Sequence, residues 1–216
     1  MLKKIDILGI EVDNYTVREA MMQVENYLDN TIMNTIETID MKMLELAGQD
    51  ETVRACIEQL DLAVIGEKEI LIAADVHSSQ RLSETINHDF FREFIKRIIR
   101  NHKRVFLLAE TIAQEEQLEH FLVGKYEQIE VAGHCAIEEK SNDFKSVVNE
   151  INSASADVIF SILPSPLQEQ FLTENKSKLD AKIWYGLSSD LDRVSSHFAI
   201  RARKATNRET GASTIL

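Results

Sequence analysis

The chain alternates between two hydrophobic patterns. Short runs rich in β-branched residues predict buried strands, and longer stretches with apolar residues every three or four positions predict helices. The predicted strands are residues 31–39, 61–66, 104–109, 128–133, 157–162 and 181–187. The predicted helices are residues 41–60 with a break near Gly48, 88–102, 112–126, 142–152 with a cap at Ser141 or Asn142, and 166–179, while 69–76 fits either type. This alternation predicts an α/β fold, namely a doubly wound, Rossmann-like and mostly parallel sheet.

The pattern shows no repeat, low-complexity linker or Gly/Ser-rich hinge, which favours a single domain over residues 1–192 followed by a basic tail, 193–216. The formal net charge of −12 argues against a general nucleic-acid binder, because neutralising phosphates requires a basic face. The tail nevertheless holds five basic residues and no acid between 193 and 208. It therefore either contacts an anionic membrane or is simply solvated. The basic stretch 90–104 leaves the same two alternatives, with a solvated helix face favoured.

Cysteine usage and hydropathy place the protein in a reducing compartment. The two cysteines, Cys56 and Cys135, are far apart and form no C-x-x-C, so a structural zinc site is not expected. No run of about 18 apolar residues occurs, and the start does not resemble a signal peptide. We expect a cytoplasmic protein.

Polar residues stand where predicted strands end. Thr38 and Asp40 close the first strand, Glu67 follows the second, and His134 follows the strand 128–133. Ligands of open α/β sheets bind at this edge, and a carboxylate there can act as a general base. Asp40 serves equally as a helix cap, the simpler role. A hydrogen-bonded structural role is likewise the simpler one for His134.

Both prolines of the chain, Pro164 and Pro166, lie at one strand-to-helix junction. Pro166 is predicted at the first helical position, where its missing N–H has no intrahelical partner to lose. The helix N-terminus offers free N–H groups suited to a phosphate, with Gln168 and Glu169 in its first turn. The alternative is that Glu169 only complements the helix dipole and Gln168 is solvated.

Several common catalytic signatures are missing. The sequence contains no G-x-G-x-x-G, no G-x-x-x-x-G-K-[ST] and no G-x-S-x-G. No Asp-x-Asp pair lies between the predicted strands, which disfavours the metal-and-diphosphate site of many sugar-nucleotide enzymes.

The order of segments resembles the bacterial WecG/TagA/CpsF family of glycosyltransferases. "ILGIEVDNYTVREAMMQVENYL" resembles that family's opening, and "KRVFLLAETIAQEEQLEHFLVGKYEQIEVAGH" resembles its central section. The stretch "VVNEINSASADVIFSILPSPLQEQFLTENKSKL" is the most similar, with Pro166, Gln168, Glu169 and Asn175 standing in the places of the family's motif. The likeness runs in order to about residue 192.

This resemblance implies transfer of an N-acetylhexosamine-type sugar from a UDP-sugar to a polyprenyl-diphosphate-linked sugar. Such reactions build cell-envelope polysaccharides at the inner face of the membrane. The resemblance also implies that no metal is required, that the protein contacts the membrane peripherally, and that chains are able to self-associate. Two alternatives stay open: a catalytically degenerate scaffold of the same fold, and an unrelated ligand-binding domain.

The resemblance also assigns site residues. It implies donor contacts from Thr38, Gln168 and Glu169 and a diphosphate contact from Arg81.

The family's general-base aspartate falls at Gly66, and the family's asparagine after the threonine is Asp40 here. Glu67 or Asp40 is therefore the candidate base.

Overall fold

The computed structural model describes residues 3–140 and 143–187, and its core is a six-stranded sheet in the order β4-β3-β8-β7-β5-β6. All pairings in that sheet are parallel. Its strands are β3 (Asn34–Ile39), β4 (Leu62–Ile65), β5 (Arg104–Ala109), β6 (Glu130–Ala136), β7 (Val158–Ser161) and β8 (Ile183–Gly186). This confirms the predicted Rossmann-like, mostly parallel α/β fold.

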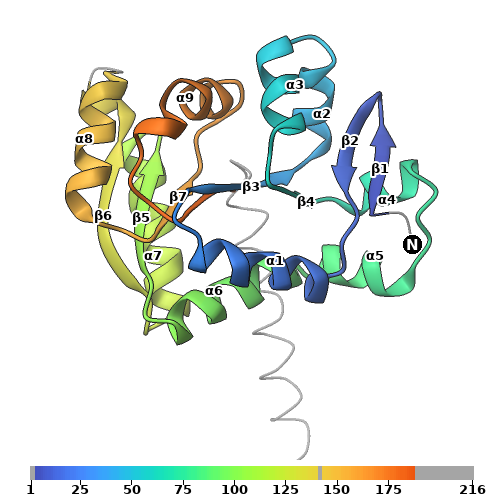
Figure 1. Cartoon of the computed structure of the whole chain (residues 1–216), viewed down its shortest axis with the longest axis horizontal. Coiled ribbons are helices and arrows are strands. Elements are labelled where there is room, and N and C mark those ends of the chain that lie inside the picture. The colour runs from blue at the N-terminus through green and yellow to red at the C-terminus, as the bar shows by residue number, and fades with distance from the viewer. Residues whose placement is uncertain (1–2, 141–142, 188–216) are drawn as a thin grey trace, which may run out of the picture.

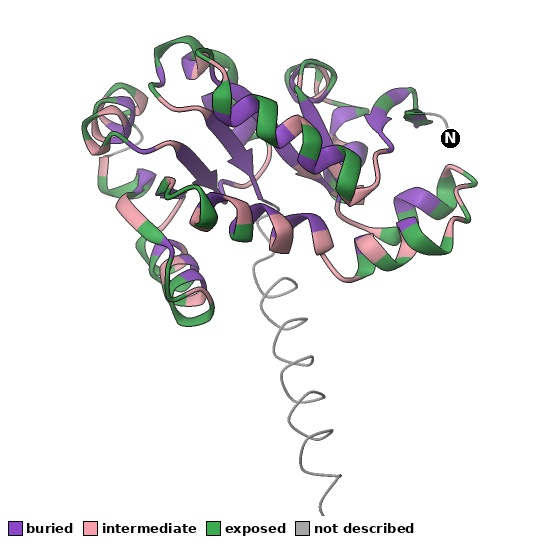
Figure 2. Ribbon diagram, turned by 60° about the horizontal axis from the view of Figure 1, so that its bottom comes forward, coloured by how far each residue is buried: buried purple, intermediate pink, exposed green. Residues whose placement is uncertain are grey.

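Helices cover both faces of the sheet (Figure 1), and its inner strands are largely buried (Figure 2). One apolar cluster joins the sheet to α1 (Val17–Asp29), α6 (Asp89–Arg100) and α7 (Ile112–Lys125). The opposite face packs against α8 (Phe144–Ala154) and α9 (Leu167–Asn175). The other helices are α2 (Met41–Ala47), α3 (Glu51–Glu58), α4 (Lys68–Ala73), α5 (Ser79–Ile86), η1 (Ile137–Lys140) and η2 (Lys176–Lys178).

A hairpin that the hydrophobic pattern did not predict covers one edge of the sheet. Strands β1 (Lys4–Ile7) and β2 (Ile10–Asp13) pair antiparallel and pack beside β4. The Ala63 backbone N–H of β4 donates to Asp13 Oδ2 at 2.9 Å, so this edge amide has a partner. Covering the edge in this way prevents further strands from adding to β4.

Three local predictions need correction. Strand β6 continues to Ala136, so His134 lies inside the strand rather than after it. Helix α8 is capped by Asp143, whose side chain accepts from the Lys145 N–H at 3.1 Å. Pro166 precedes the first helical residue of α9, Leu167, instead of occupying that position. The Gln168 N–H donates to the Pro164 carbonyl oxygen, so a turn that begins at Pro164 leads into the helix.

The basic stretch 90–104 forms the solvated face of a helix, as favoured. Helix α6 buries three phenylalanines and two isoleucines on one side. On the other side Arg92 pairs with Asp89 at 2.9 Å, and Lys96 pairs with Glu93 at 2.8 Å. Arg97 pairs with Glu25 of α1 and Lys103 pairs with Asp157, so four of the six basic residues of this stretch pair with acids of α6 or of neighbouring segments. Within the described ranges, no helix is long and apolar enough to cross a bilayer.

Candidate functional site

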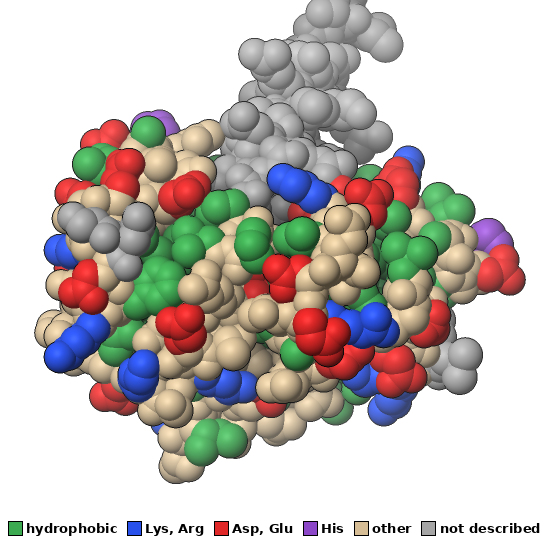
Figure 3. Space-filling model, turned by 90° about the horizontal axis from the view of Figure 1, so that it is seen from above, with side chains coloured by type: hydrophobic (Ala, Val, Ile, Leu, Met, Phe, Trp, Pro, Cys, Tyr) green, Lys and Arg blue, Asp and Glu red, His purple; other side chains and the backbone are tan. Residues whose placement is uncertain are grey.

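A cavity of about 320 Å³ opens at the carboxyl edge of the sheet, between α2 and α9. Its polar lining includes Thr38, Asp40, Lys42 and Gln168, and Pro166 forms part of its apolar wall. The molecular face formed by α2, α3, α8 and α9 carries acidic side chains interspersed with apolar and basic ones (Figure 3). The cavity is open and is not lined by acidic groups alone. Ligand pockets of roughly this size and larger hold small organic molecules.

A second, smaller cavity of about 50 Å³ adjoins the first. Thr38 lines both cavities, whereas Gly66 and Arg81 line only the smaller one. The hydroxyl groups of Thr38 and Tyr185 are 3.2 Å apart and share a hydrogen bond, which fixes the threonine between the two spaces. Four of the six predicted site residues, Thr38, Asp40, Gln168 and Arg81, thus line two neighbouring cavities that meet at Thr38, whereas Glu67 and Glu169 line neither.

Asp40 and Glu67 both accept hydrogen bonds from the first turn of α2. Asp40 Oδ1 accepts from the Met43 N–H at 2.8 Å, which confirms the predicted cap. Glu67 Oε2 accepts from the Met41 N–H at 3.0 Å. Asp40 also lines the larger cavity together with Gln168, whereas Glu67 does not. The two candidate bases are therefore close together but face different surroundings.

The backbone at Gly66 leaves no space for a side chain. A Cβ atom at this position would lie 2.6 Å from Thr38 Cγ2 and 3.1 Å from the Ile39 carbonyl oxygen. The Gly66 N–H donates to that same carbonyl at 2.8 Å, which holds the end of β4 against the end of β3. With this backbone, an aspartate cannot stand at position 66 unless Thr38 moves.

Arg81 is buried, with 5% of its surface exposed, and its guanidinium is held by the protein. Its Nε–H donates to Asn14 Oδ1 at 3.2 Å, and its Nη1 lies 3.1 Å from Glu84 Oε2. Burial lowers the pKa of Arg81, and the Glu84 carboxylate opposes that shift. The same Glu84 oxygen accepts from the Val17 N–H at 3.1 Å, so this pair also anchors α1.

Gln168 is buried against the end of β8. A Cβ atom added to Gly186 would lie 2.7 Å from Gln168 Nε2 and 2.8 Å from Glu37 Cγ. Only glycine at position 186 therefore allows the Gln168 side chain to pack against β8. Glu169, the next residue, is fully buried and does not line the cavity. Its Oε1 accepts from the Ser165 hydroxyl at 2.6 Å.

Glu37 and Glu169 form a buried carboxyl pair behind Gln168. Neither Glu37 oxygen has a hydrogen-bond partner in residues 3–140 or 143–187, and the same holds for Glu169 Oε2. Burial, followed by the negative charge of Glu169, raises the pKa of Glu37 well above its usual range. The Trp184 indole N–H acts in the opposite direction without reaching hydrogen-bond geometry. Burial likewise raises the pKa of Glu169, and the Ser165 hydroxyl partly offsets it. Burial therefore favours the protonated form of both carboxyls.

Sequence reasoning missed Glu37 and Gly186. A glutamate inside the β-branched run "NTIETI" is a usable signal, because helices cover both faces of a parallel sheet and a charged residue in one of its inner strands is therefore buried. Gly186 gives no comparable signal, since its close contact with Gln168 depends on how α9 packs.

The basic tail, 193–216, lies outside the described residues. So do Asp190 and Asp192, which form an Asp-x-Asp pair beyond the predicted strands. The domain boundary at residue 192 falls in the same part of the chain and stays a prediction.

Comparison with known proteins identifies the family. A sequence profile described as "Glycosyl transferase WecG/TagA/CpsF family" matches residues 5–201. The chain belongs to this glycosyltransferase family. The match confirms the resemblance drawn from the ordered segments. It leaves the individual site residues as predictions, because the match concerns the chain as a whole.

Individual relatives of this glycosyltransferase come from Staphylococcus aureus. The chain is 24% identical over 197 residues to the N-acetylglucosaminyldiphosphoundecaprenol N-acetyl-beta-D-mannosaminyltransferase of strain MRSA252, across 88% of this chain and 74% of the relative. Proteins of the same name from strains NCTC 8325 and COL match with the same identity and coverage. None of these comparisons supports the alternative of a catalytically degenerate scaffold.

Proposed function

We propose that the protein transfers an N-acetylhexosamine-type sugar from a UDP-sugar to a polyprenyl-diphosphate-linked sugar in cell-envelope polysaccharide synthesis. Membership of the glycosyltransferase family supports the reaction class. The relatives' name, which gives an N-acetylglucosaminyl-diphosphoundecaprenol acceptor and an N-acetylmannosaminyl group, supports the choice of substrates. The observation that carries the proposal is the cavity at the carboxyl edge, where Asp40 and Gln168 line one space.

Asp40 is the general base in this proposal. It takes the proton from the acceptor hydroxyl as that oxygen attacks the anomeric carbon, and UDP departs from the opposite face. The position of the family's aspartate is Gly66 by resemblance, and it has no space for a side chain. The Gly66 N–H donates a hydrogen bond to the carbonyl oxygen of Ile39, the residue before Asp40. In this chain the carboxylate has moved from the end of β4 to the adjacent end of β3. Glu67, bonded to the Met41 N–H, orients α2.

The donor contacts in this proposal are Thr38 and Gln168, with Lys42 supplying positive charge for the diphosphate. Arg81 lies in the adjoining cavity, on the far side of Thr38, where Glu84 pairs with its guanidinium, so Lys42 is the main source of positive charge. Glu169 does not contact the donor in this proposal. Its Oε1 accepts a hydrogen bond from the Ser165 hydroxyl at 2.6 Å and so fixes the position of Ser165. A fixed cation beside a developing diphosphate charge lowers the barrier to its departure.

Transfer without a metal ion is part of the proposal. Its support is the family resemblance, together with the cationic side chains of Lys42 and Arg81 beside the two adjoining cavities. We expect turnover to survive treatment with a chelator. Turnover that stops with the chelator and returns with Mg²⁺ or Mn²⁺ would point to Asp190 and Asp192 instead.

The protein works peripherally at the inner face of the cell membrane in this proposal, with its basic tail on anionic lipid. Basic residues near such a surface contribute about 1 kcal/mol each. We expect deletion of residues 193–216 to reduce sedimentation with phosphatidylglycerol vesicles and to leave binding to neutral vesicles unchanged. Equal sedimentation of both forms would exclude the tail as the membrane contact. Self-association is tested in the same preparations by analytical ultracentrifugation.

The test of function uses the purified full chain, UDP-N-acetylmannosamine and an N-acetylglucosaminyl-diphospho-lipid. We expect the lipid to gain the mass of one N-acetylhexosamine and UDP to appear in equal amount. UDP-N-acetylglucosamine serves as the matched donor control, since it differs at a single carbon. Failure with every UDP-N-acetylhexosamine, or UDP release without a larger lipid, would contradict the proposal.

A further inference from the structure

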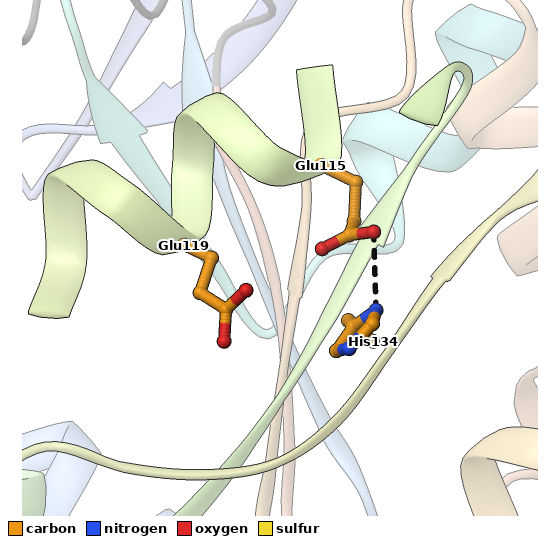
Figure 4. A group of neighbouring side chains, drawn as sticks. All are labelled: Glu115, Glu119 and His134. Carbon is orange, nitrogen blue, oxygen red and sulfur yellow. Dashed lines mark ion pairs between the residues drawn. The ribbon is translucent and has the colours of Figure 1, made fainter. Parts of the chain in front are cut away.

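Three metal-binding side chains converge between α7 and the edge strand β6, away from the cavity between α2 and α9. They are Glu115 and Glu119, one helical turn apart on α7, and His134 on β6 (Figure 4). One donor atom from each lies within 4.8 Å of the other two. Residues four apart on a helix share a face, so both carboxylates meet the strand at the same place.

The Glu115 carboxylate lacks a full set of partners. Its side chain is 4% exposed, and its Oε1 has no hydrogen-bond partner among the described residues. Its other oxygen is 3.0 Å from His134 Nδ1. A buried acceptor without a partner is energetically unfavourable, which indicates that something else binds there.

The spacing fits a small divalent cation. Ligands about 2.0–2.2 Å from a tetrahedral zinc ion are roughly 3.3 Å from one another. The Glu115–His134 contact of 3.0 Å is close to that separation. Glu119 is half-buried and makes no ion pair with a described residue, so its carboxylate is able to turn toward the other two.

We propose that Glu115, Glu119 and His134 bind a divalent transition metal, with Zn²⁺ the best fit. One imidazole and two carboxylates suit zinc, whereas Mg²⁺ prefers oxygen ligands and retains its waters. The metal joins α7 to β6, the outer strand of the sheet, where the register with β5 shifts between Val105 and Phe106. Its role is to hold this edge in place, separate from sugar transfer.

The test is calorimetric zinc titration of the chelator-treated full chain. We expect one zinc per chain, and at least about a tenfold weaker affinity in His134→Ala and in Glu119→Gln. Glu116→Gln is the matched control, because it removes a neighbouring carboxylate of α7 outside the cluster and leaves affinity unchanged. Circular dichroism checks that each variant is folded.

Thermal unfolding gives a second readout. With free zinc about 100-fold above the wild-type dissociation constant, Tm rises by roughly 5–10 °C in wild type and in Glu116→Gln, but by at most about half as much in His134→Ala. No zinc binding, equal affinity in wild type and His134→Ala, or Mg²⁺ binding as tight as Zn²⁺ would overturn the proposal. Neither readout measures UDP affinity or turnover. The zinc result therefore stands even if the protein does not bind UDP or transfer sugar.

Discussion

Two sets of carboxyl groups lie at the carboxyl edge of β3, and their surroundings differ sharply. Asp40 and Glu67 accept hydrogen bonds from the first turn of α2, with Asp40 in the wall of an open cavity. Glu37 and Glu169 are fully buried behind that wall, and three of their four oxygens lack a hydrogen-bond partner in the part of the chain that the structure describes. Asp40 lies only three positions after Glu37 in the sequence.

The difference teaches which acids are available for chemistry. A carboxylate in the wall of an open cavity is placed to accept a proton from a substrate there. Burial raises the pKa of Glu37 and Glu169 and so favours their protonated form, which cannot accept a further proton. We infer that the buried pair supports the wall while Asp40 performs the proton transfer.

The largest expected effect is a loss of turnover when Asp40 is replaced, and the other acids of the cavity should not show it. Asp40→Asn should lower kcat by about 10²–10⁴-fold, the usual contribution of a general base, with UDP affinity nearly unchanged. Asparagine caps a helix as well as aspartate does, so α2 stays intact. The matched control is Glu45→Gln, another acid of the cavity lining. If Asp40→Asn retains turnover while Glu67→Gln loses it, the base is Glu67.

Glycine substitutions sharpen the contrast between the packed wall and the exposed surface. Gly66→Ala and Gly186→Ala should each lower the free energy of unfolding by about 1–3 kcal/mol, because the new Cβ meets Thr38 or Gln168 at under 3 Å. Gly124→Ala is the control. It lies in α7, where an added Cβ would meet no described atom within 4 Å apart from its chain neighbours and the backbone of its own helix, and the variant should gain about 0.5–1 kcal/mol of stability. Urea unfolding measures all three, and equal stability of all three would contradict the close packing.

A smaller effect concerns the pH dependence of stability. The pKa of Glu37 is raised in the folded state, so its contribution is fully present below the unfolded value of about 4.3 and is lost as pH rises through the folded value. Wild type should therefore lose stability on the alkaline side. Glu37→Gln should be more stable than wild type by about 1–2 kcal/mol at pH 8.5, with a smaller difference at pH 5. A constant difference across pH would mean that Glu37 is already ionised.

Most of the fold follows from the sequence because local pattern and tertiary structure agree. The run "RVFLLA" forms β5 over the predicted residues, and the break near Gly48 separates α2 from α3. The hairpin β1–β2 was missed because each of its strands holds only two apolar residues, separated by a charged one, and so lacks the continuous apolar run of a strand such as β4. His134 was placed after a strand because Gly133 resembles a strand end, yet β5 pairs with β6 beyond it.

The candidate site was predictable in its location but not in its internal arrangement. The strand-end rule brought Asp40 and Gln168 to one edge, and the structure places both on one cavity. Burial of Glu169 and the enclosure of Arg81 by Asn14 and Glu84 depend on contacts between distant segments. No pattern along a single segment records such contacts.

The most direct test of the central claim is UDP binding measured by calorimetry on three forms of the full chain. The cavity between α2 and α9 should bind UDP in wild type, and Gln168→Ala should weaken that binding by at least about tenfold, since a buried amide facing the ligand is lost. Gln170→Ala, on the same helix with its amide bonded to Glu174 at the surface, should bind UDP as wild type does. No UDP binding in wild type, or equal affinity in all three forms, would contradict the assignment of this cavity as the donor site.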